Sequence, residues 1–286
     1  MLSLDQQKAF DEITNSSHKM FFVTGDAGTG KSYLISKLKN TKRCAPTGVA
    51  AQLIKGCTLH RLLGIRPNAL YANPKTLFKR VNGFDYLIVD EVSMVGFEIF
   101  NMLMSAVFLS GWRGKIVFVG DFAQLPPVRD QPCYEHAEWD KVQQIQLQTQ
   151  HRQADPLFTQ ILNDVRHARL TPELISYLKE RHVEELPKDK IMLASRTHQV
   201  AEQNKRRISE AISDNRPTLL IPSDVKAQSR YWDVKKAEAD IIKNGRTILN
   251  LLAFEGAQVM TTINADTYCN GTIGVSTSFN KTRLII

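Results

Sequence analysis

The sequence lacks long apolar runs, and this absence limits the classes of protein to which it can belong. None of its apolar stretches approaches the roughly 18 residues that a membrane-spanning helix needs. Its first residues, Met1 to Asp5, have neither the basic start nor the apolar centre of a signal peptide. We therefore expect an intracellular protein, in the cytoplasm or the nucleus, that has no membrane partner.

Cysteine is also scarce, and the few cysteines are scattered. No two of them have a C-x-x-C spacing, so the sequence suggests neither a zinc site nor a disulfide framework. No internal repeat or low-complexity tract is present. We expect reduced and mostly buried thiols at Cys44, Cys57, Cys133 and Cys269.

The sequence does contain enough apolar material for a sizeable core, together with an excess of positive charge. Its 286 residues, of which 43% are hydrophobic, suit two domains of ordinary size or one large domain. The formal net charge of +8 favours a polyanionic partner such as nucleic acid, although a basic balance alone does not identify one.

Short apolar runs alternate with segments of helical period, which predicts α/β units around a mainly parallel sheet. We expect strands at residues 20–24, 43–45, 86–89, 116–119, 191–194, 257–261 and 272–276. We expect helices at residues 5–14, 32–38, 48–55, 97–109, 156–166, 172–181 and 200–212. Thr171 and Pro172 have the pattern of a cap and a first helical residue. The segment 214–244 is expected to be a connection.

Residues 25 to 32 read GDAGTGKS and stand between an apolar run and a segment of helical period. The spacing G-x-x-x-x-G-K-[ST] between a strand and a helix predicts a loop whose backbone N–H groups hold a di- or triphosphate. A glycine-rich turn kept for packing is the alternative, which the order of strand, loop and helix disfavours. Lys31 is expected to reach the β- and γ-phosphates, and Ser32 to hold Mg²⁺. The predicted nucleotide ligands are Gly25, Asp26, Ala27, Gly28, Thr29, Gly30, Lys31 and Ser32.

A second apolar strand, at residues 86–89, ends in the two carboxylates Asp90 and Glu91. Asp90 is expected to bind Mg²⁺ through water. Glu91 is expected to orient and deprotonate the water that attacks the γ-phosphate. A solvated acidic turn is the alternative for this pair, and the phosphate-binding loop upstream makes it the weaker interpretation.

A third strand, at residues 115–119, leads into the segment Gly120–Val128. In this segment Gln124 is followed by Leu125 and then by Pro126 and Pro127. A glutamine in front of such a rigid turn can contact the γ-phosphate and report its loss. An ordinary strand exit with a solvated Gln124 is the alternative.

Together these segments resemble superfamily-one DNA helicases of the PIF/RecD type. The resemblance implies a P-loop NTPase with two RecA-like lobes and mainly parallel sheets: lobe 1 at residues 1–145, with a small insert at about 61–84, and a partial lobe 2 at residues 146–286. The matching segments, in the order of the family, are Leu2–Gln6, Gly25–Ser32, Ala45–Ala51, Thr58–His60, Asp90–Met94, Gly120–Val128, His151–Gln153, Gly256–Met260 and Asn270–Gly274.

The resemblance also implies roles at the nucleotide. Gln6 would read the adenine edge and favour ATP, with the adjacent Gln7 as a competitor for that role. Arg152 resembles the arginine that reaches the γ-phosphate from the second lobe, where a guanidinium stabilises charge on the phosphoryl oxygens. A surface arginine next to the helix at 156–166 is the alternative.

For the DNA, the resemblance implies contacts by Thr47 and His60, and Arg196 is a third candidate because it stands where an expected strand leads into a helix. Thr47 and His60 can both donate to phosphate oxygens, although a lone histidine is as often structural. The basic run 205–207 is either part of a groove that follows the DNA backbone or a solvated helix face. In the insert, Tyr71 and Phe78 either stack on bases or pack locally.

The implied activity is that of an ATP-dependent DNA helicase or translocase that moves 5′ to 3′ on single-stranded DNA or on DNA with a single-stranded tail. The chain lacks the later family patterns T-x-H-K-x-Q-G and V-A-x-S-R. We therefore expect an incomplete second lobe. A truncated or split motor is an alternative, namely a DNA-stimulated ATPase that does not unwind and needs a second chain; otherwise a monomer is expected.

A P-loop kinase or a nucleotide-gated interaction module unrelated to DNA is an alternative from another class. The co-occurrence of the segments at 45–51, 90–94 and 120–128 argues against it, because a kinase has no use for all three. Repair, recombination and replication all use motors of the helicase type, and the sequence agrees with each of them.

Overall fold

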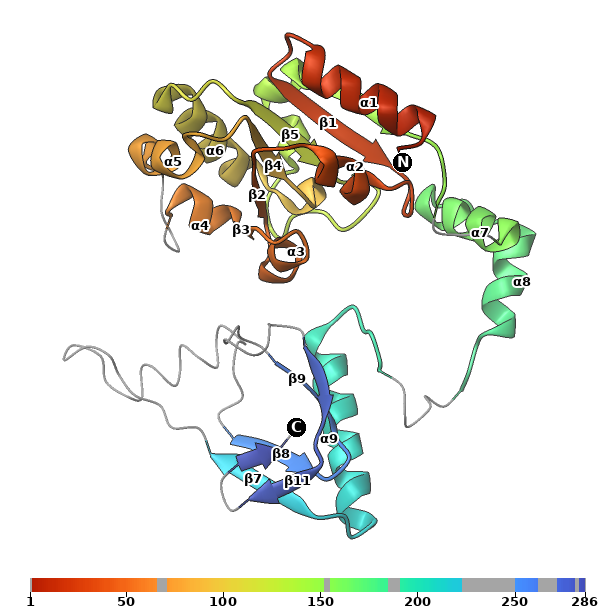
Figure 1. Ribbon diagram of the computed structural model, residues 1–286. Coiled ribbons are helices and arrows are strands. Elements are labelled where there is room, and N and C mark those ends of the chain that lie inside the picture. Colours follow the sequence, from red (N-terminus) through yellow and green to blue (C-terminus); the bar gives the residue numbers. More distant parts are fainter. Residues whose placement is uncertain are drawn as a thin grey trace, which may run out of the picture. The chain divides into compact units, whose positions relative to one another are not determined.

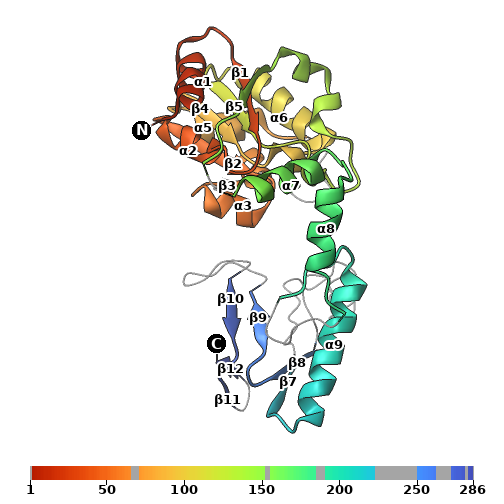
Figure 2. The ribbon, with the colours of Figure 1, turned by 90° about the vertical axis from the view of Figure 1, so that its right-hand side faces the viewer.

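The computed structural model describes residues 2–65, 71–151, 155–184, 191–222, 250–261, 272–280 and 283–285. The chain divides into two compact units, residues 1–182 and 183–286, which we describe one by one (Figures 1 and 2). The first unit extends beyond residue 145 because helices α7 (Pro156–Arg166) and α8 (Pro172–Glu180) belong to it. The lobe boundary between residues 145 and 146 stays a prediction. No helix among the described residues is long and apolar enough to cross a membrane.

The first unit is built on a six-stranded sheet in which every pair of neighbours is parallel. The strand order is β3-β2-β4-β5-β1-β6. This confirms the α/β class and the parallel sheet that the sequence predicts for this part. The strands are β1 (Met20–Gly25), β2 (Thr41–Ala45), β3 (Cys57–Thr58), β4 (Tyr86–Val89), β5 (Lys115–Val119) and β6 (Gln143–Leu147).

Alternate residues of each central strand enter two different hydrophobic clusters, because successive side chains point to opposite faces of a sheet. Phe21 packs with side chains of α1 (Leu4–Asn15) and α2 (Lys31–Lys37). Phe22 packs in the other cluster with side chains of α4 (Leu59–Leu63), α5 (Pro74–Val81) and α6 (Phe97–Ser110). Helices therefore cover both faces of the sheet (Figure 1).

The remaining helices of the first unit connect these strands. Those predicted from the sequence are confirmed to within a few residues at each end, and the short α4 and α5 are additional. The Thr171 hydroxyl oxygen accepts a hydrogen bond from the Leu174 N–H at 3.3 Å, which confirms the predicted cap of α8. The helices are α3 (Gly48–Leu53), α4 (Leu59–Leu63), α5 (Pro74–Val81) and α6 (Phe97–Ser110), with 3₁₀ turns η1 (Val92–Met94), η2 (Cys133–Glu135) and η3 (Ala137–Lys141).

The cysteines of the described residues are free thiols, as predicted. Cys44 and Cys133 are buried and Cys57 is half-buried. Cys269 lies outside the described residues.

In the second unit, helix α9 (Thr197–Ser213) contacts strand β8. The described strands form three antiparallel pairs rather than a parallel sheet. Strand β7 (Thr218–Pro222) lies in the segment 214–244, which the sequence predicts to be a connection. The pairs are β7 (Thr218–Pro222) with β8 (Asn250–Phe254), β9 (Gln258–Met260) with β10 (Ile273–Val275), and β11 (Ser278–Asn280) with β12 (Arg283–Ile285).

The strand predicted at residues 191–194 is wrong, because these residues form no regular structure. The side chain of Leu193 is 93% exposed and that of Ile191 is 55% exposed. An apolar run becomes a buried strand only where neighbouring elements cover it, and Met192 and Ala194 are no more than half-buried.

Candidate nucleotide-binding site

The predicted phosphate-binding loop runs from the end of β1 to the start of α2, and its glycines are required by its backbone. Gly30 has φ +79°, in the left-handed region, and a Cβ there would collide with the Gln6 side chain. A Cβ on Gly25 would lie 2.5 Å from the Leu147 carbonyl oxygen. Larger residues at either position would displace the loop or its neighbours.

Lys31 is folded back onto the loop. Its Nζ donates to the carbonyl oxygens of Gly25 at 2.6 Å and of Asp26 at 3.1 Å. The Thr29 hydroxyl also donates to the Asp26 carbonyl, at 2.9 Å. The ammonium group is therefore held where a phosphate in the loop would compete with these carbonyls for it. Ser32 is exposed in the first turn of α2.

Gln6 lies buried against the same loop. Its Nε2 donates to the Thr29 carbonyl oxygen at 3.1 Å, and its Oε1 accepts from the Ser3 N–H at 3.1 Å. The neighbouring Gln7 is exposed and donates to Asp11 at 2.9 Å. Of the two candidates for reading a base, only Gln6 contacts the phosphate-binding loop in this structure.

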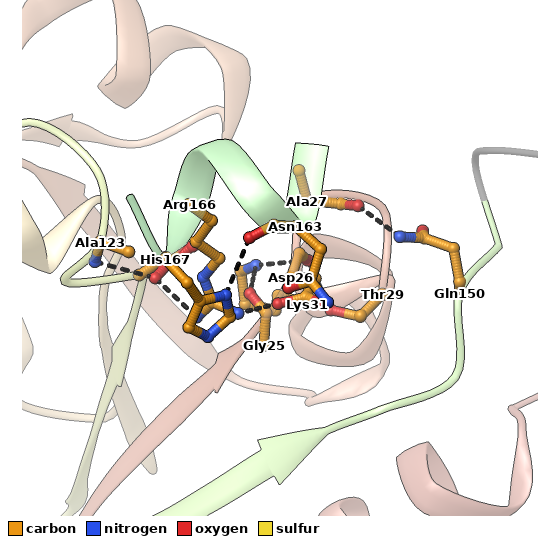
Figure 3. A network of polar contacts seen from close by, with 11 residues as sticks. Gly25, Asp26, Ala27, Thr29, Lys31, Ala123, Gln150, Asn163, Arg166 and His167 are labelled. Carbon is orange, nitrogen blue, oxygen red and sulfur yellow. Dashed lines mark hydrogen bonds and ion pairs between the residues drawn. The ribbon is translucent and has the colours of Figure 1, made fainter. Parts of the chain in front are cut away.

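The segment after β6 runs along the outside of the loop (Figure 3). Gln150 Nε2 donates to the Ala27 carbonyl oxygen at 2.9 Å, and the His151 N–H donates to the Gly28 carbonyl oxygen at 2.9 Å. The candidate Arg152 directly follows His151 in the sequence, but it lies outside the described residues.

Asp5 fastens the start of that segment to helix α1. Its Oδ2 accepts the N–H groups of Gln148 and Thr149, both at 2.9 Å, and its Oδ1 accepts the Ser3 hydroxyl at 2.5 Å. Burial alone would raise the pKa of Asp5, but these hydrogen bonds to the carboxylate outweigh it and lower the pKa.

The acidic pair lies near Lys31 at the carboxyl end of β4. Burial raises the pKa of Asp90, and the Lys31 charge opposes this rise. Burial, followed by the Asp90 charge, raises the pKa of Glu91, and Lys31 again opposes the rise while Asp121 adds to it. Lys31, Asp90 and Glu91 thus belong to one electrostatic cluster.

Gln124 lies in a tight turn that follows β5. The Gln124 N–H donates to the Asp121 carbonyl oxygen at 2.9 Å, and the Ala123 N–H donates to Asp121 Oδ1 at 3.0 Å. The Gln124 side chain is exposed. Since β1, β4 and β5 are parallel, Lys31, Glu91 and Gln124 follow strands that end at the same edge of the sheet.

The structure adds one residue that sequence reasoning missed. Arg166, the last residue of α7, pairs with Asp26 (Figure 3) and also with Asp121. Asp121 could have been found from its place directly after a strand, in the same segment as Gln124. Arg166 carries no such local signal, because its two partners are far from it in the sequence.

The two candidate DNA contacts of the first unit occupy equivalent places on neighbouring strands. Ala45 of β2 pairs with Thr58 of β3, and Thr47 and His60 each lie two residues further on. His60 is exposed, and the half-buried Thr47 caps α3 by accepting the Ala50 N–H at 3.2 Å. The structure therefore brings Thr47 and His60 to the same edge of the sheet.

In the second unit, the exposed Arg196 is the residue before α9. The basic run on that helix is partly neutralised, because Arg206 and Arg207 both pair with Glu210, at 3.0 and 3.2 Å. This favours a solvated helix face for the run. Arg196 stays a prediction that rests on its place before α9.

In the insert, the side chains of Tyr71 and Phe78 are 79% and 37% exposed, so neither aromatic ring is buried in the core. Phe78 borders a shallow hollow of about 250 Å³ together with Lys75, Lys79 and Leu109. Residues 66–70 lie outside the described residues.

Comparisons with known proteins agree with this geometry. The AAA domain family profile matches residues 1–188. An ATP-dependent DNA helicase Pif1 of Bdellovibrio bacteriovorus is 31% identical over 291 residues, which cover 91% of this chain and 63% of that relative. The crystal structure of the Pif1 helicase from Candida albicans has a TM-score of 0.73 at 25% identity and covers 97% of this chain and 69% of that chain.

A Pif1 helicase from Bacteroides, crystallised with ADP-AlF3 and single-stranded DNA, matches with a TM-score of 0.68 at 23% identity. The match covers 100% of this chain and 74% of that chain, and it shows a shared fold. The fold and the loop define a P-loop NTPase of the RecA-like class. The chain belongs to the PIF-like family of superfamily-one helicases, and it spans 63% of the length of the Bdellovibrio relative.

Proposed function

We propose that this chain forms the motor core of an ATP-dependent DNA helicase that moves 5′ to 3′ on single-stranded DNA. The observation that carries the proposal is that the phosphate-binding loop with Lys31 and the pair Asp90-Glu91 follow parallel strands that end at the same edge of the sheet. Membership of the PIF-like family adds to it. The same membership leaves the kinase alternative without support.

Lys31 begins the proposed cycle by exchanging the loop carbonyls for the β- and γ-phosphates of ATP. The backbone N–H groups of the loop and the start of α2 then hold the phosphates. Glu91 orients the attacking water and takes up its proton. Gln124 contacts the γ-phosphate and responds to its loss.

The donor chemistry at the loop fits Mg²⁺. The Ser32 hydroxyl and the Asp90 carboxylate are oxygen ligands of the kind that Mg²⁺ prefers, and phosphate oxygens and water complete its shell. Among the described residues no cluster of three or more His, Cys, Asp or Glu side chains forms a separate metal cage. When bound, the ion neutralises charge on the phosphates.

Two further roles come from the family resemblance. Gln6 selects adenine after leaving its partner in the loop, the Thr29 carbonyl. Arg152 stabilises the charge that spreads over the γ-phosphoryl oxygens. The docking of His151 onto Gly28 supports this role, because it fixes the residue before Arg152 beside the loop.

For the DNA, Thr47 and His60 contact the backbone of a single strand, and Arg196 contacts it from the second unit. The Bacteroides structure with single-stranded DNA supports a DNA partner for this family. Contacts to phosphate and sugar carry no sequence information, so we expect weak sequence preference and strong dependence on salt.

Strand separation on tailed duplexes tests this function. A duplex with a 5′ single-stranded tail should be unwound in the presence of ATP, and a duplex with a 3′ tail should not. ATP turnover that DNA stimulates, without unwinding of either duplex, would instead support the alternative of a split motor that needs a second chain. Unwinding of the 3′-tailed duplex alone would contradict the proposed 5′-to-3′ direction.

A further inference from the structure

One guanidinium group joins two loops of the candidate site to the end of helix α7. Arg166 Nη1 pairs with Asp26 Oδ1 in the phosphate-binding loop (Figure 3), and Nη2 lies 2.9 Å from Asp121 Oδ1. The side chains of Arg166 and Asp121 are 23% and 5% exposed, so their pair is largely removed from water. Loss of one partner of such a pair is strongly destabilising, because the other charge stays buried without compensation.

Each carboxylate belongs to a loop with a part in the proposed reaction. The backbone carbonyl of Asp26 is one of the two acceptors that hold Lys31. Asp121 holds the turn of Gln124 through its backbone carbonyl and its Oδ1. If either loop moves on phosphate binding, its ion pair with Arg166 must lengthen or Arg166 must move with it.

Arg166 ends α7, and contacts among residues 164, 169 and 171 connect the end of this helix to the start of α8; we call this connection the α7–α8 joint. The buried Asp164 accepts the Thr171 hydroxyl at 3.0 Å, and Thr171 is the cap of α8. The Arg169 N–H donates to the Asp164 carbonyl at 2.8 Å, and its guanidinium pairs with the Asp164 carboxylate at 3.5 Å. These contacts link the end of α7 to the start of α8.

We propose that Arg166 is a positioning residue that keeps the phosphate-binding loop and the Gln124 loop in register and couples both to the α7–α8 pair. Helix α8 ends at Glu180, just before the chain passes into the second unit at residue 183. Loss of Arg166 therefore uncouples ATP turnover from DNA. This inference rests on the proposed function, because it assumes that DNA stimulates the ATPase.

The chemistry of arginine suits this role better than that of lysine. A guanidinium has several N–H groups in a fixed plane and can serve two carboxylates at once, whereas an ammonium is a single point charge on a flexible stem. Arg166→Lys should therefore retain one link at a time and give an intermediate phenotype.

The test compares Arg166→Ala with Arg169→Ala in the full chain. Both substitutions remove one positive charge and one side chain from the same joint, but Arg169 contacts neither loop among the described residues. The readout is the ratio of ATPase rates with and without single-stranded DNA, together with kcat and KM for ATP.

We expect Arg166→Ala to lower this ratio about 5-fold or more, the usual lower end of an allosteric coupling, mainly through kcat. Arg169→Ala should stay within about 2-fold of the wild type. It keeps the hydrogen bond of Thr171 to Asp164 and the backbone hydrogen bond of residue 169 to the Asp164 carbonyl, and it loses only a 3.5 Å ion pair whose arginine is 56% exposed. A folded Arg166→Ala protein with the same ratio as Arg169→Ala would overturn the inference.

Asp26→Asn provides a second variant if Arg166→Ala fails to fold. It removes the charge from only the link to the phosphate-binding loop, at a side chain that is 44% exposed. We expect it to lower the ratio as well. Where Arg166→Ala does fold, its double variant with Asp26→Asn should be no worse than Arg166→Ala alone. An unchanged ratio for Asp26→Asn, or independent losses that multiply, would overturn the inference.

The two hypotheses fail in different ways. Wild-type protein whose ATPase ignores DNA would overturn both the proposed function and this inference. Wild-type protein that is stimulated, with Arg166→Ala stimulated to the same degree, would overturn only the role of Arg166.

Discussion

Lys31 donates to the Gly25 carbonyl oxygen at 2.6 Å, across the loop that it is expected to serve. The ammonium group is therefore held by neutral acceptors in the position from which it can reach a phosphate. A phosphate carries full negative charge and replaces such acceptors readily, because charge-assisted hydrogen bonds are the stronger ones.

Replacing Lys31 by alanine should abolish most of the ATPase activity. The loss of one donor aimed at the developing charge costs about 10²- to 10³-fold in kcat. Steady-state phosphate release measures this effect. Lys37→Ala is the matched control, because Lys37 lies at the end of the same helix with its Nζ over the Tyr33 ring at 4.5 Å. Equal losses in the two variants would contradict the assignment.

Glu91→Gln should separate hydrolysis from binding. Removal of a general base lowers kcat about 10²- to 10⁴-fold, while the affinity for a fluorescent ATP analogue should change little. Because burial raises the pKa of Glu91, the neutral amide should not lower the melting temperature. The exposed Glu98 offers a control as Glu98→Gln. Unchanged turnover in Glu91→Gln would remove Glu91 from the reaction.

Gln6→Ala should weaken the preference for ATP over GTP, since Gln6 is the glutamine that contacts the phosphate-binding loop. Competition of each nucleotide against the fluorescent analogue measures the preference. Gln7→Ala should keep it, because Gln7 is bonded to Asp11 on the exposed side of α1. The opposite pattern would transfer the role to Gln7.

Asp5→Ala should destabilise the fold at neutral pH by about 1 kcal/mol, because hydrogen bonds to a half-exposed carboxylate are partly screened by water. The pKa of Asp5 is lowered in the folded state from its ordinary value of 3.8. Its contribution is therefore complete above pH 3.8 and is lost as the pH falls towards the folded-state pKa.

Urea unfolding at several pH values checks this prediction. The gap between wild type and Asp5→Ala should be constant from pH 7 to about pH 5 and should close in more acidic solution. Asp11→Ala, on the exposed face of the same helix, should show a smaller gap. A gap for Asp5→Ala that widens as the pH falls would contradict the account.

The thiols should react with iodoacetamide in a fixed order. Burial raises the pKa of Cys44 well above its ordinary value and raises the pKa of Cys133 to about 12. In a Cys269→Ser background, the half-buried Cys57 should be alkylated in the native protein, and the other two only after unfolding. Mass spectrometry of digested protein measures the order, and native labelling of Cys133 would contradict the burial seen here.

The parts of the site that the sequence predicted are those that consist of local patterns. The loop at 25–32 and the pair Asp90-Glu91 each combine a strand with the residues directly after it, and parallel strands bring such ends to one edge. No local pattern announces Arg166, because its contacts depend on where α7 packs. The sequence did not predict the docking of residues 150 and 151 onto the loop for the same reason.

Errors in the predicted elements have a similar cause. The run at 191–194 is apolar enough for a strand, but Ile191 and Leu193 are exposed. Strand β6 was missed although the buried Ile145 and Leu147 alternate with exposed glutamines at 144 and 146, the pattern of a half-buried edge strand. So short an alternation also occurs in loops, and the pairing with β1 identifies it as a strand. Both cases were decided by tertiary contacts.

The most direct test of the central claim is the rate of ATP hydrolysis by the wild-type chain with and without single-stranded DNA at low salt. We expect this rate to rise severalfold on saturation with DNA and to fall by about 10²- to 10³-fold in Lys31→Ala. Equal rates with and without DNA, in protein shown to bind ATP, would contradict the central claim.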